Sequence, residues 1–180
     1  ISAHAHIYGY SLHGIMTQFV LSTLKFLEST YPNLKHFGVS GVSNGGLLAL
    51  ITAALSPKIK FVLASSILQS IYDRALQPRN VYDSTEYYFY MQGPFWMEFD
   101  IAEIATLVAP KLLMFEVGNR DKIVAKWKPE FAKIEAIYQR LGFESRLEVI
   151  TFFGKHEFAE NLGIEKLKQK IDSLPELFDV

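Results

Sequence analysis

Two patterns of hydrophobic residues alternate along this chain. In the first, apolar residues follow one another in short runs, as is typical of strands buried on both faces of a parallel sheet. In the second, apolar residues recur every three or four positions, as is typical of a helix with one buried face. The short runs predict strands at His36–Ser40, Ile59–Ala64, Lys111–Val117 and Arg146–Phe152.

The helical pattern falls between these runs. It is clearest in Pro129–Leu141, which has a proline near its start and Gly142 just past its end. These two residue types favour those two positions of a helix. We predict helices at Ile15–Ser29, Gly46–Leu55, Pro129–Leu141 and Ile164–Ile171, with a buried face on the first formed by Met16, Phe19, Val20, Leu24 and Leu27.

The alternation of strands and helices predicts an α/β fold. We expect a mostly parallel, doubly wound sheet with right-handed crossovers and helices on both faces. With 180 residues, 49% of them hydrophobic, the chain can bury a sizeable core. We find no repeat or linker, and we therefore expect one domain over residues 1–180, with a candidate cap insertion at about 70–105 and a candidate remnant strand at Ile1–His6.

Composition narrows the classes of partner. The 18 basic and 19 acidic residues nearly balance, so neither nucleic acid nor an anionic membrane is expected as a partner. The longest apolar run, Leu47–Leu55, is too short to span a bilayer. Cysteine is absent, which excludes disulfides and a cysteine nucleophile and leaves the compartment open. Because the chain begins at Ile1, we expect a preceding segment in the natural protein.

The stretch GVSNGG, residues 41–46, joins a predicted strand to a predicted helix. A serine in this position can be a nucleophile held in a strained turn, with glycines two residues before and after it that avoid a collision between strand and helix. We therefore interpret Ser43 as a candidate nucleophile, with Gly41 and Gly45 needed for close approach. The Asn44 N–H would lie at the helix N-terminus and is a candidate oxyanion donor.

Two further residues complete a candidate triad. Asp121 follows the third predicted strand and His156 follows the fourth, and ligands of parallel sheets gather outside the carboxyl ends of the strands. Taken singly, Asp121 suits an ordinary turn, His156 an ordinary loop, and G-x-S-x-G occurs by chance in about one such sequence in twenty. The order Ser, Asp, His, each after its own strand, favours a nucleophile, an orienting acid and a general base.

These residues also carry a resemblance to a known family. With GVSNGG as the nucleophile elbow, FEVGNRDKIV as the acid turn and FFGKHEF as the histidine loop, the chain resembles the α/β-hydrolase fold. Together with AHIYGYSLHG, the same motifs resemble dienelactone-hydrolase-like and acetyl xylan esterase-like carboxylesterases. The resemblance implies hydrolysis of a small-molecule or carbohydrate ester through an acyl-enzyme, without a cofactor, by Ser43, His156 and Asp121.

The chain departs from that family in two respects. The family has more strands than the four predicted here, so the first strands of the fold are missing from our prediction, and an exposed sheet edge would favour a homo-oligomer. In the family, a second oxyanion amide comes from a loop after an early strand. No segment of this chain matches that loop.

Three alternatives stay open. SNGG is also similar to the elbow of prolyl-oligopeptidase-like serine peptidases, which share the residue order. His4 and His6 share one face of a strand and could ligate a metal ion, although no further ligand with clear spacing follows. Finally, the domain could bind a ligand without turnover.

The segment Tyr82–Phe99 is rich in aromatic residues and shows no clean period. Most of these rings are expected to pack a cap onto the sheet, because aromatic clusters usually belong to cores. Tyr and Trp also have polar tips and flat faces that can stack on a sugar or aryl group. We therefore name Trp96 and Tyr88 as candidate substrate-binding residues.

Overall fold

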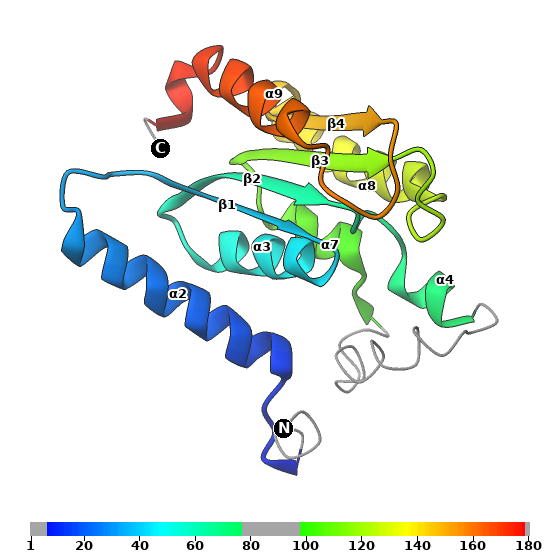
Figure 1. Ribbon diagram of the computed structural model, residues 1–180, viewed down its shortest axis with the longest axis horizontal. Helices are drawn as coiled ribbons and strands as arrows, with labels where there is room; N and C mark the ends of the chain where they lie inside the picture. Colours follow the sequence, from blue (N-terminus) through cyan, green and yellow to red (C-terminus); the bar gives the residue numbers. More distant parts are fainter. Residues whose placement is uncertain (1–6, 77–97, 179–180) are drawn as a thin grey trace.

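The computed structural model of the chain describes residues 7–76 and 98–178. Its centre is a parallel sheet with strand order β1-β2-β3-β4, in which each strand pairs with the next along the chain (Figure 1). The candidate remnant strand and most of the candidate cap lie outside the described residues. The strands are β1 (Phe37–Val42), β2 (Ile59–Ser65), β3 (Leu112–Gly118) and β4 (Leu147–Phe152).

Helices occupy most of the connections between strands. All four predicted helices are confirmed, with ends that differ from the prediction by a few residues, and two short helices flank residues 77–97. The α-helices are α2 (Leu12–Thr30), α3 (Asn44–Leu55), α4 (Ile71–Leu76), α7 (Ile101–Thr106), α8 (Trp127–Arg140) and α9 (Asn161–Asp172), and the 3₁₀ turns are η1 (Glu144–Arg146) and η2 (Pro175–Phe178).

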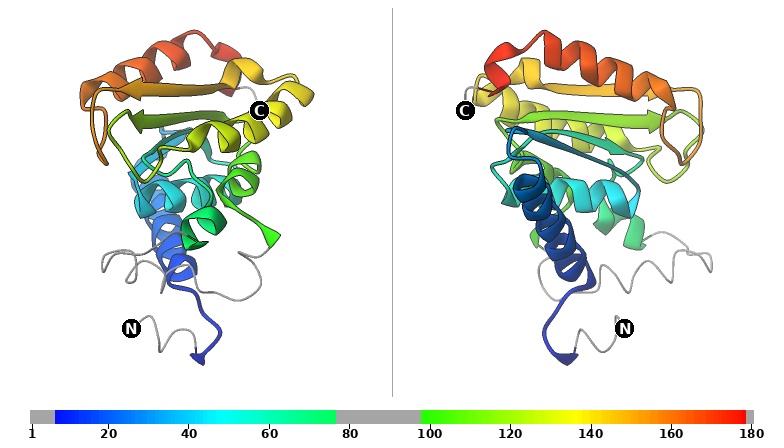
Figure 2. Two further views of the ribbon diagram at one scale, coloured as in Figure 1. Left: turned by 90° about the vertical axis from the view of Figure 1, so that its right-hand side faces the viewer. Right: turned by 60° about the vertical axis from the view of Figure 1, so that its left-hand side comes forward.

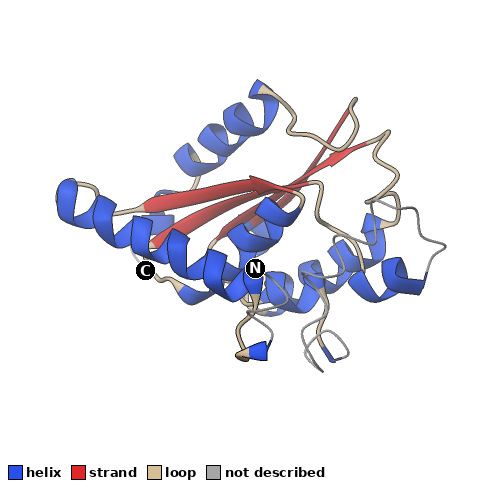
Figure 3. Ribbon diagram, turned by 60° about the horizontal axis from the view of Figure 1, so that its bottom comes forward, coloured by secondary structure: helices blue, strands red, loops and turns tan. Residues whose placement is uncertain are grey.

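The sheet is covered on both faces, as the apolar runs predicted. Successive side chains of a strand point to opposite faces, and in β2 Val62 packs into one apolar cluster with α3, α7 and α8 while Leu63 packs into another with α9 and η2. In β3, Phe115 and Met114 divide in the same way. Figure 2 shows α9 on one side of the sheet and α3 and α8 on the other, and Figure 3 shows helices on both sides of the sheet. The chain therefore has the expected doubly wound α/β architecture.

Helix α2 departs from its predicted packing. Phe19 was expected on the buried face, yet it is 68% exposed. The buried residues are His13, Thr17 and Leu24. They lie on one side of the helix because Thr17 and Leu24 follow His13 by four and eleven positions. The helix packs against α3 rather than directly on the sheet, so a narrower stripe of side chains is covered.

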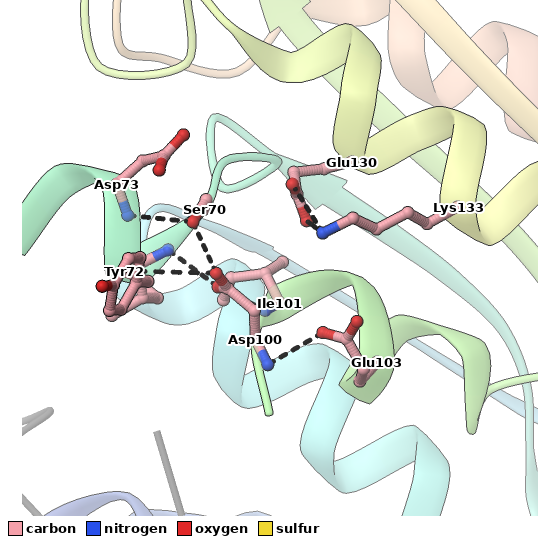
Figure 4. Close-up of polar contacts among 9 residues, drawn as sticks. Ser70, Tyr72, Asp73, Asp100, Ile101, Glu103, Glu130 and Lys133 are labelled. Atoms are coloured by element: carbon pink, nitrogen blue, oxygen red, sulfur yellow. Dashed lines mark hydrogen bonds and ion pairs between the residues drawn. The ribbon is translucent and has the colours of Figure 1, made fainter. Parts of the chain in front are cut away.

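Asp100 connects the two helices that flank residues 77–97. Its carboxylate accepts hydrogen bonds from the Ser70 hydroxyl at 2.6 Å and from the Ile71 N–H at 2.7 Å, just where α4 begins (Figure 4). Asp100 is also the N-cap of α7, and Glu103 bonds back to the Asp100 N–H at 2.8 Å to complete a capping box. The half-buried Asp100 side chain thus connects the start of α4 to the start of α7.

A second polar pair lies near this junction on α8. Glu130 is 5% exposed, and its carboxylate lies 3.0 Å from the Lys133 ammonium (Figure 4). Burial raises the pKa of Glu130 above its usual value, and the hydrogen bond and charge of Lys133 only partly offset that effect. The negative charges of nearby Asp100 and Glu103 raise the pKa of Glu130 further, in the same direction as burial.

Candidate active site

The turn between β1 and α3 has the geometry of a nucleophile elbow. Ser43 has a positive φ of 58° with ψ −124°, a strained conformation for a residue with a side chain. Its N–H donates to the Ser65 carbonyl at 2.8 Å, and its own carbonyl accepts from the Leu47 N–H at 3.1 Å. The backbone on both sides of Ser43 is therefore held in place.

The glycines of the elbow differ in importance from our expectation. A Cβ at Gly41 would lie only 2.1 Å from the Gly45 carbonyl oxygen, so close approach of strand and helix does require glycine there. Among the described residues, nothing lies within 4 Å of a Cβ built at Gly45, so the expected collision at that position is wrong. The second crowded glycine of the elbow is Gly46, where a Cβ would meet Ile67 at 3.0 Å.

The Ser43 hydroxyl is not used to cap its own helix. Although Ser43 is the N-cap residue of α3, its side chain makes no capping hydrogen bond in the described part of the chain. Serine at this position ordinarily accepts a hydrogen bond from the first turn. Here the helix N-terminus begins with Asn44, and the backbone amides of such a terminus attract developing negative charge.

Asp121 and His156 lie in direct contact. The Nδ1 atom of His156 is 2.8 Å from Oδ2 of Asp121, and the other carboxylate oxygen accepts the Ile123 N–H at 2.9 Å. The Asp121 side chain is 1% exposed and that of His156 is 30% exposed. The acid is thus buried and the imidazole remains open to solvent on one side, which suits an orienting acid and a base that must reach substrate.

The pKa of Asp121 is lowered from its usual value. Burial alone raises the pKa, but hydrogen bonds from His156, the Ile123 N–H and Ser66, together with the charge of His156, outweigh burial. The carboxylate therefore stays ionised at neutral pH and can hold the Nδ1–H tautomer of the imidazole.

The acid turn and the histidine loop are joined along their backbones. The Asn119 N–H donates to the Phe152 carbonyl and the Arg120 N–H donates to the Gly154 carbonyl, each at 2.9 Å. The Arg120 guanidinium lies 4.0 Å from the centre of the Phe153 ring, a cation–π contact. Beyond the carboxyl ends of β3 and β4 the two segments run side by side (Figure 1).

Ser65 links this pair of loops to the elbow, and sequence reasoning did not find it. Its hydroxyl donates to the Glu157 carbonyl at 2.9 Å, while its carbonyl accepts the Ser43 N–H at 2.8 Å. The neighbouring Ser66 hydroxyl lies 3.4 Å from the same Glu157 carbonyl. The signal in the sequence was two polar residues at the carboxyl end of the buried run IKFVLA.

The structure does not describe the remaining candidate residues. Trp96 and Tyr88 lie outside the described residues, as do His4 and His6. Over residues 7–76 and 98–178, no group of three or more histidine, aspartate or glutamate side chains is arranged to hold a metal ion. None of the helices described is both long and apolar enough to cross a membrane.

Comparison with known families decides the classification. Residues 29–171 match the family described as acetyl xylan esterase (AXE1). The chain belongs to the acetyl xylan esterase family. The resemblance to acetyl xylan esterase-like carboxylesterases is therefore confirmed, and the family is one of carboxylic ester hydrolases with the α/β-hydrolase fold. No curated protein matches the chain.

Solved structures support the fold of this acetyl xylan esterase family member. A glucuronoyl esterase from Solibacter usitatus aligns with a TM-score of 0.71 at 13% identity, over 89% of this chain and 48% of that one. A CE15 glucuronoyl esterase from Teredinibacter turnerae T7901 gives 0.68 at 15%, over 91% and 47%. The Pyrococcus furiosus esterase Pf2001 gives 0.57 at 20%, over 94% and 64%. The chain thus spans about half to two thirds of the length of these structures.

Proposed function

We propose that this chain carries the catalytic triad of a serine esterase that hydrolyses acetyl or other esters of carbohydrates. Ser43 is the nucleophile, His156 the general base and acid, and Asp121 the residue that orients the imidazole. The observation that carries the proposal is the 2.8 Å contact of His156 with buried Asp121, on a loop tied through Ser65 to the strained turn of Ser43.

The reaction follows from these positions. The Ser43 hydroxyl attacks the ester carbonyl carbon as the Nε2 atom of His156 takes its proton, and the imidazolium is stabilised by the Asp121 carboxylate at Nδ1. The tetrahedral intermediate collapses, His156 protonates the departing sugar oxygen, and an acyl-Ser43 ester remains. Water, deprotonated by His156, then releases the acid and restores Ser43.

The Asn44 N–H is the oxyanion donor that this chain supplies in the proposal. Asn44 is the first residue of α3, where the helix dipole adds to the donor strength of the amide. In α/β-hydrolases, a second amide comes from a loop after an early strand. No counterpart was found in this sequence, so we assign one donor only.

Family membership favours an ester over a peptide as the substrate. The matched family is described as acetyl xylan esterase, and similar structures are named glucuronoyl esterases or a methylesterase, so a carbohydrate ester is the substrate class to test first. Trp96 and Tyr88 remain our candidates for contact with the sugar. Acetylated xylan and a methyl ester of glucuronic acid are suitable alternative substrates.

Labelling with an active-site-directed fluorophosphonate, followed by peptide mapping, tests the proposal. This reagent reacts only with a serine that is activated by a base, so it tests nucleophile and base together. We expect the label on Ser43, no label in His156→Ala, and release of acetate from acetylated xylan. A label on another serine, or no label on the wild-type protein, would contradict the proposed triad.

A further inference from the structure

We infer that Ser65 is a positioning residue that sets the distance between the nucleophile and the base, an inference that rests on the function proposed above. Ser65 is the last residue of β2 and is fully buried. It makes one hydrogen bond to the elbow and another to the histidine loop. Neither Ser65 nor its hydroxyl is expected to touch the substrate, since both of its bonds go to the protein backbone.

The bond to the elbow fixes the nucleophile. The Ser65 carbonyl accepts the Ser43 N–H at 2.8 Å, at a turn where Ser43 has a positive φ. A strained residue keeps its conformation only when its surroundings determine it. Because Ser65 also pairs with Val42 in the sheet register, the end of β2 holds the backbone from which the Ser43 side chain projects.

The bond to the histidine loop fixes the base. The Ser65 hydroxyl donates to the carbonyl of Glu157, the residue after His156, at 2.9 Å. That loop is buried at Gly154 and Ala159 but exposed between them at Lys155, Glu157 and Phe158, so the Ser65 hydroxyl restrains its exposed part. A hydroxyl has one proton to donate, and the shorter distance gives Ser65, rather than Ser66 at 3.4 Å, the stronger bond to this carbonyl.

The strand behind Ser65 makes it a rigid reference point. β2 lies between β1 and β3, and Ser65 is paired with Val42 on one side and with Glu116 on the other. The hydrogen bonds of Ser65 to the elbow and to the histidine loop therefore both start from a strand in the interior of the sheet. A displacement of the imidazole by about 1 Å can lower the rate about a hundredfold, which is why one backbone contact to the loop can matter for catalysis.

Replacing Ser65 by alanine removes only the bond to Glu157. We expect Ser65→Ala to lower kcat and the rate of fluorophosphonate labelling about tenfold or more, with KM unchanged, because the base is misplaced while substrate contacts remain. The downfield proton resonance of the His156–Asp121 hydrogen bond should broaden in NMR spectra, since a mobile loop exposes this proton to exchange. Ser65→Thr keeps the hydroxyl on a residue that is favoured in strands. Its kcat, labelling rate and proton resonance should match those of the wild-type protein.

Thr52→Val is the matched control. The Thr52 hydroxyl is also fully buried and donates to a backbone carbonyl, that of Leu48 at 2.7 Å, but it lies within α3 away from the loops. The Thr52→Val variant should be less stable than the wild-type protein but should keep its kcat and its His156–Asp121 proton resonance. If Ser65→Ala unfolds, Ser65→Cys preserves the size with a weaker donor and is read in the same way.

Two results would overturn the inference: wild-type kcat and a sharp resonance in Ser65→Ala, or an equal loss of kcat in Thr52→Val. Failure of the wild-type protein to react with the fluorophosphonate would instead overturn the proposed function. The resonance does not depend on turnover, so it decides the role of Ser65 in either case.

Discussion

Single residues define the proposed chemistry, and Ser43 is the first to test. We expect Ser43→Ala to lower hydrolysis of p-nitrophenyl acetate by about 10⁴- to 10⁶-fold, since the covalent step is lost. Stability should barely change, because alanine keeps the backbone bonds and the hydroxyl makes no capping bond in the described structure. Initial rates and thermal unfolding of both proteins provide the measurement. Comparable turnover in the variant would move the nucleophile elsewhere.

Asp121 gives a prediction about pH. Its pKa is lowered in the folded protein, so its contribution to stability is fully present above the unfolded pKa of about 3.9 and is lost as pH falls through the folded pKa. The difference in unfolding free energy between wild type and Asp121→Asn should therefore shrink as the pH falls from about 5 to below about 4. Chemical denaturation across this range measures it, and a difference that grew on acidification would contradict the lowered pKa.

Several residues of the candidate site could be proposed from the sequence alone. Ser43, Asp121 and His156 could be proposed as a triad because each is a chemically distinctive residue at the end of a recognisable strand, and the structure contains the contact between Asp121 and His156. Ser65 could not, because its role depends on contacts with Ser43 and Glu157 that exist only in three dimensions. Gly45 was over-interpreted, since the motif does not show which glycine faces the strand.

At the scale of elements, strands and long helices were predictable and short helices were not. The buried strands were visible because parallel strands covered on both faces are apolar throughout. Helix α9 begins at Asn161, three residues before the predicted start at Ile164, and so includes Gly163. A side chain at Gly163 would collide with the buried Glu116 carboxylate, a contact that no local pattern reveals. Helix α7 was missed, although its capping box at Asp100 and Glu103 was legible in the sequence.

Asp100 provides the test at this scale. Asp100→Ala removes the N-cap of α7 and leaves the Ser70 and Ile71 donors at the start of α4 without their acceptor. We expect a loss of about 1–3 kcal/mol in unfolding free energy, from the cap together with unsatisfied donors. Asp73→Ala, an exposed acidic residue in the first turn of α4, is the control and should change stability little. Equal losses of unfolding free energy in both variants would show that the removal of an acidic charge, rather than of the hydrogen bonds made by Asp100, lowers stability.

For the whole molecule, the sheet edge at β1 is the feature to test. In the described residues β1 pairs with β2 alone, and its residues are half-buried or exposed, whereas β3 is buried throughout. Open strand edges pair with other chains. We expect residues 1–180 to self-associate with increasing concentration in sedimentation experiments.

Ser40→Lys places a charge on the exposed side of β1 and should weaken this association. Ser22→Lys adds the same charge to an exposed position of α2 and should not. Equal behaviour of both variants, or a monomer at every concentration, would show that β1 is not the contact.

The order of the strands also determines when the site can be assembled. Because neighbours in the sheet are consecutive along the chain, β1 and β2 can meet on the ribosome as soon as residue 65 has emerged, and the turn of Ser43 can be formed then. Glu157 must reach Ser65 across 92 positions, and such distant contacts form late in folding. A nascent chain would thus carry a formed nucleophile turn long before it has a base, and hydrolytic competence would arrive only after β4 and the histidine loop have been synthesised.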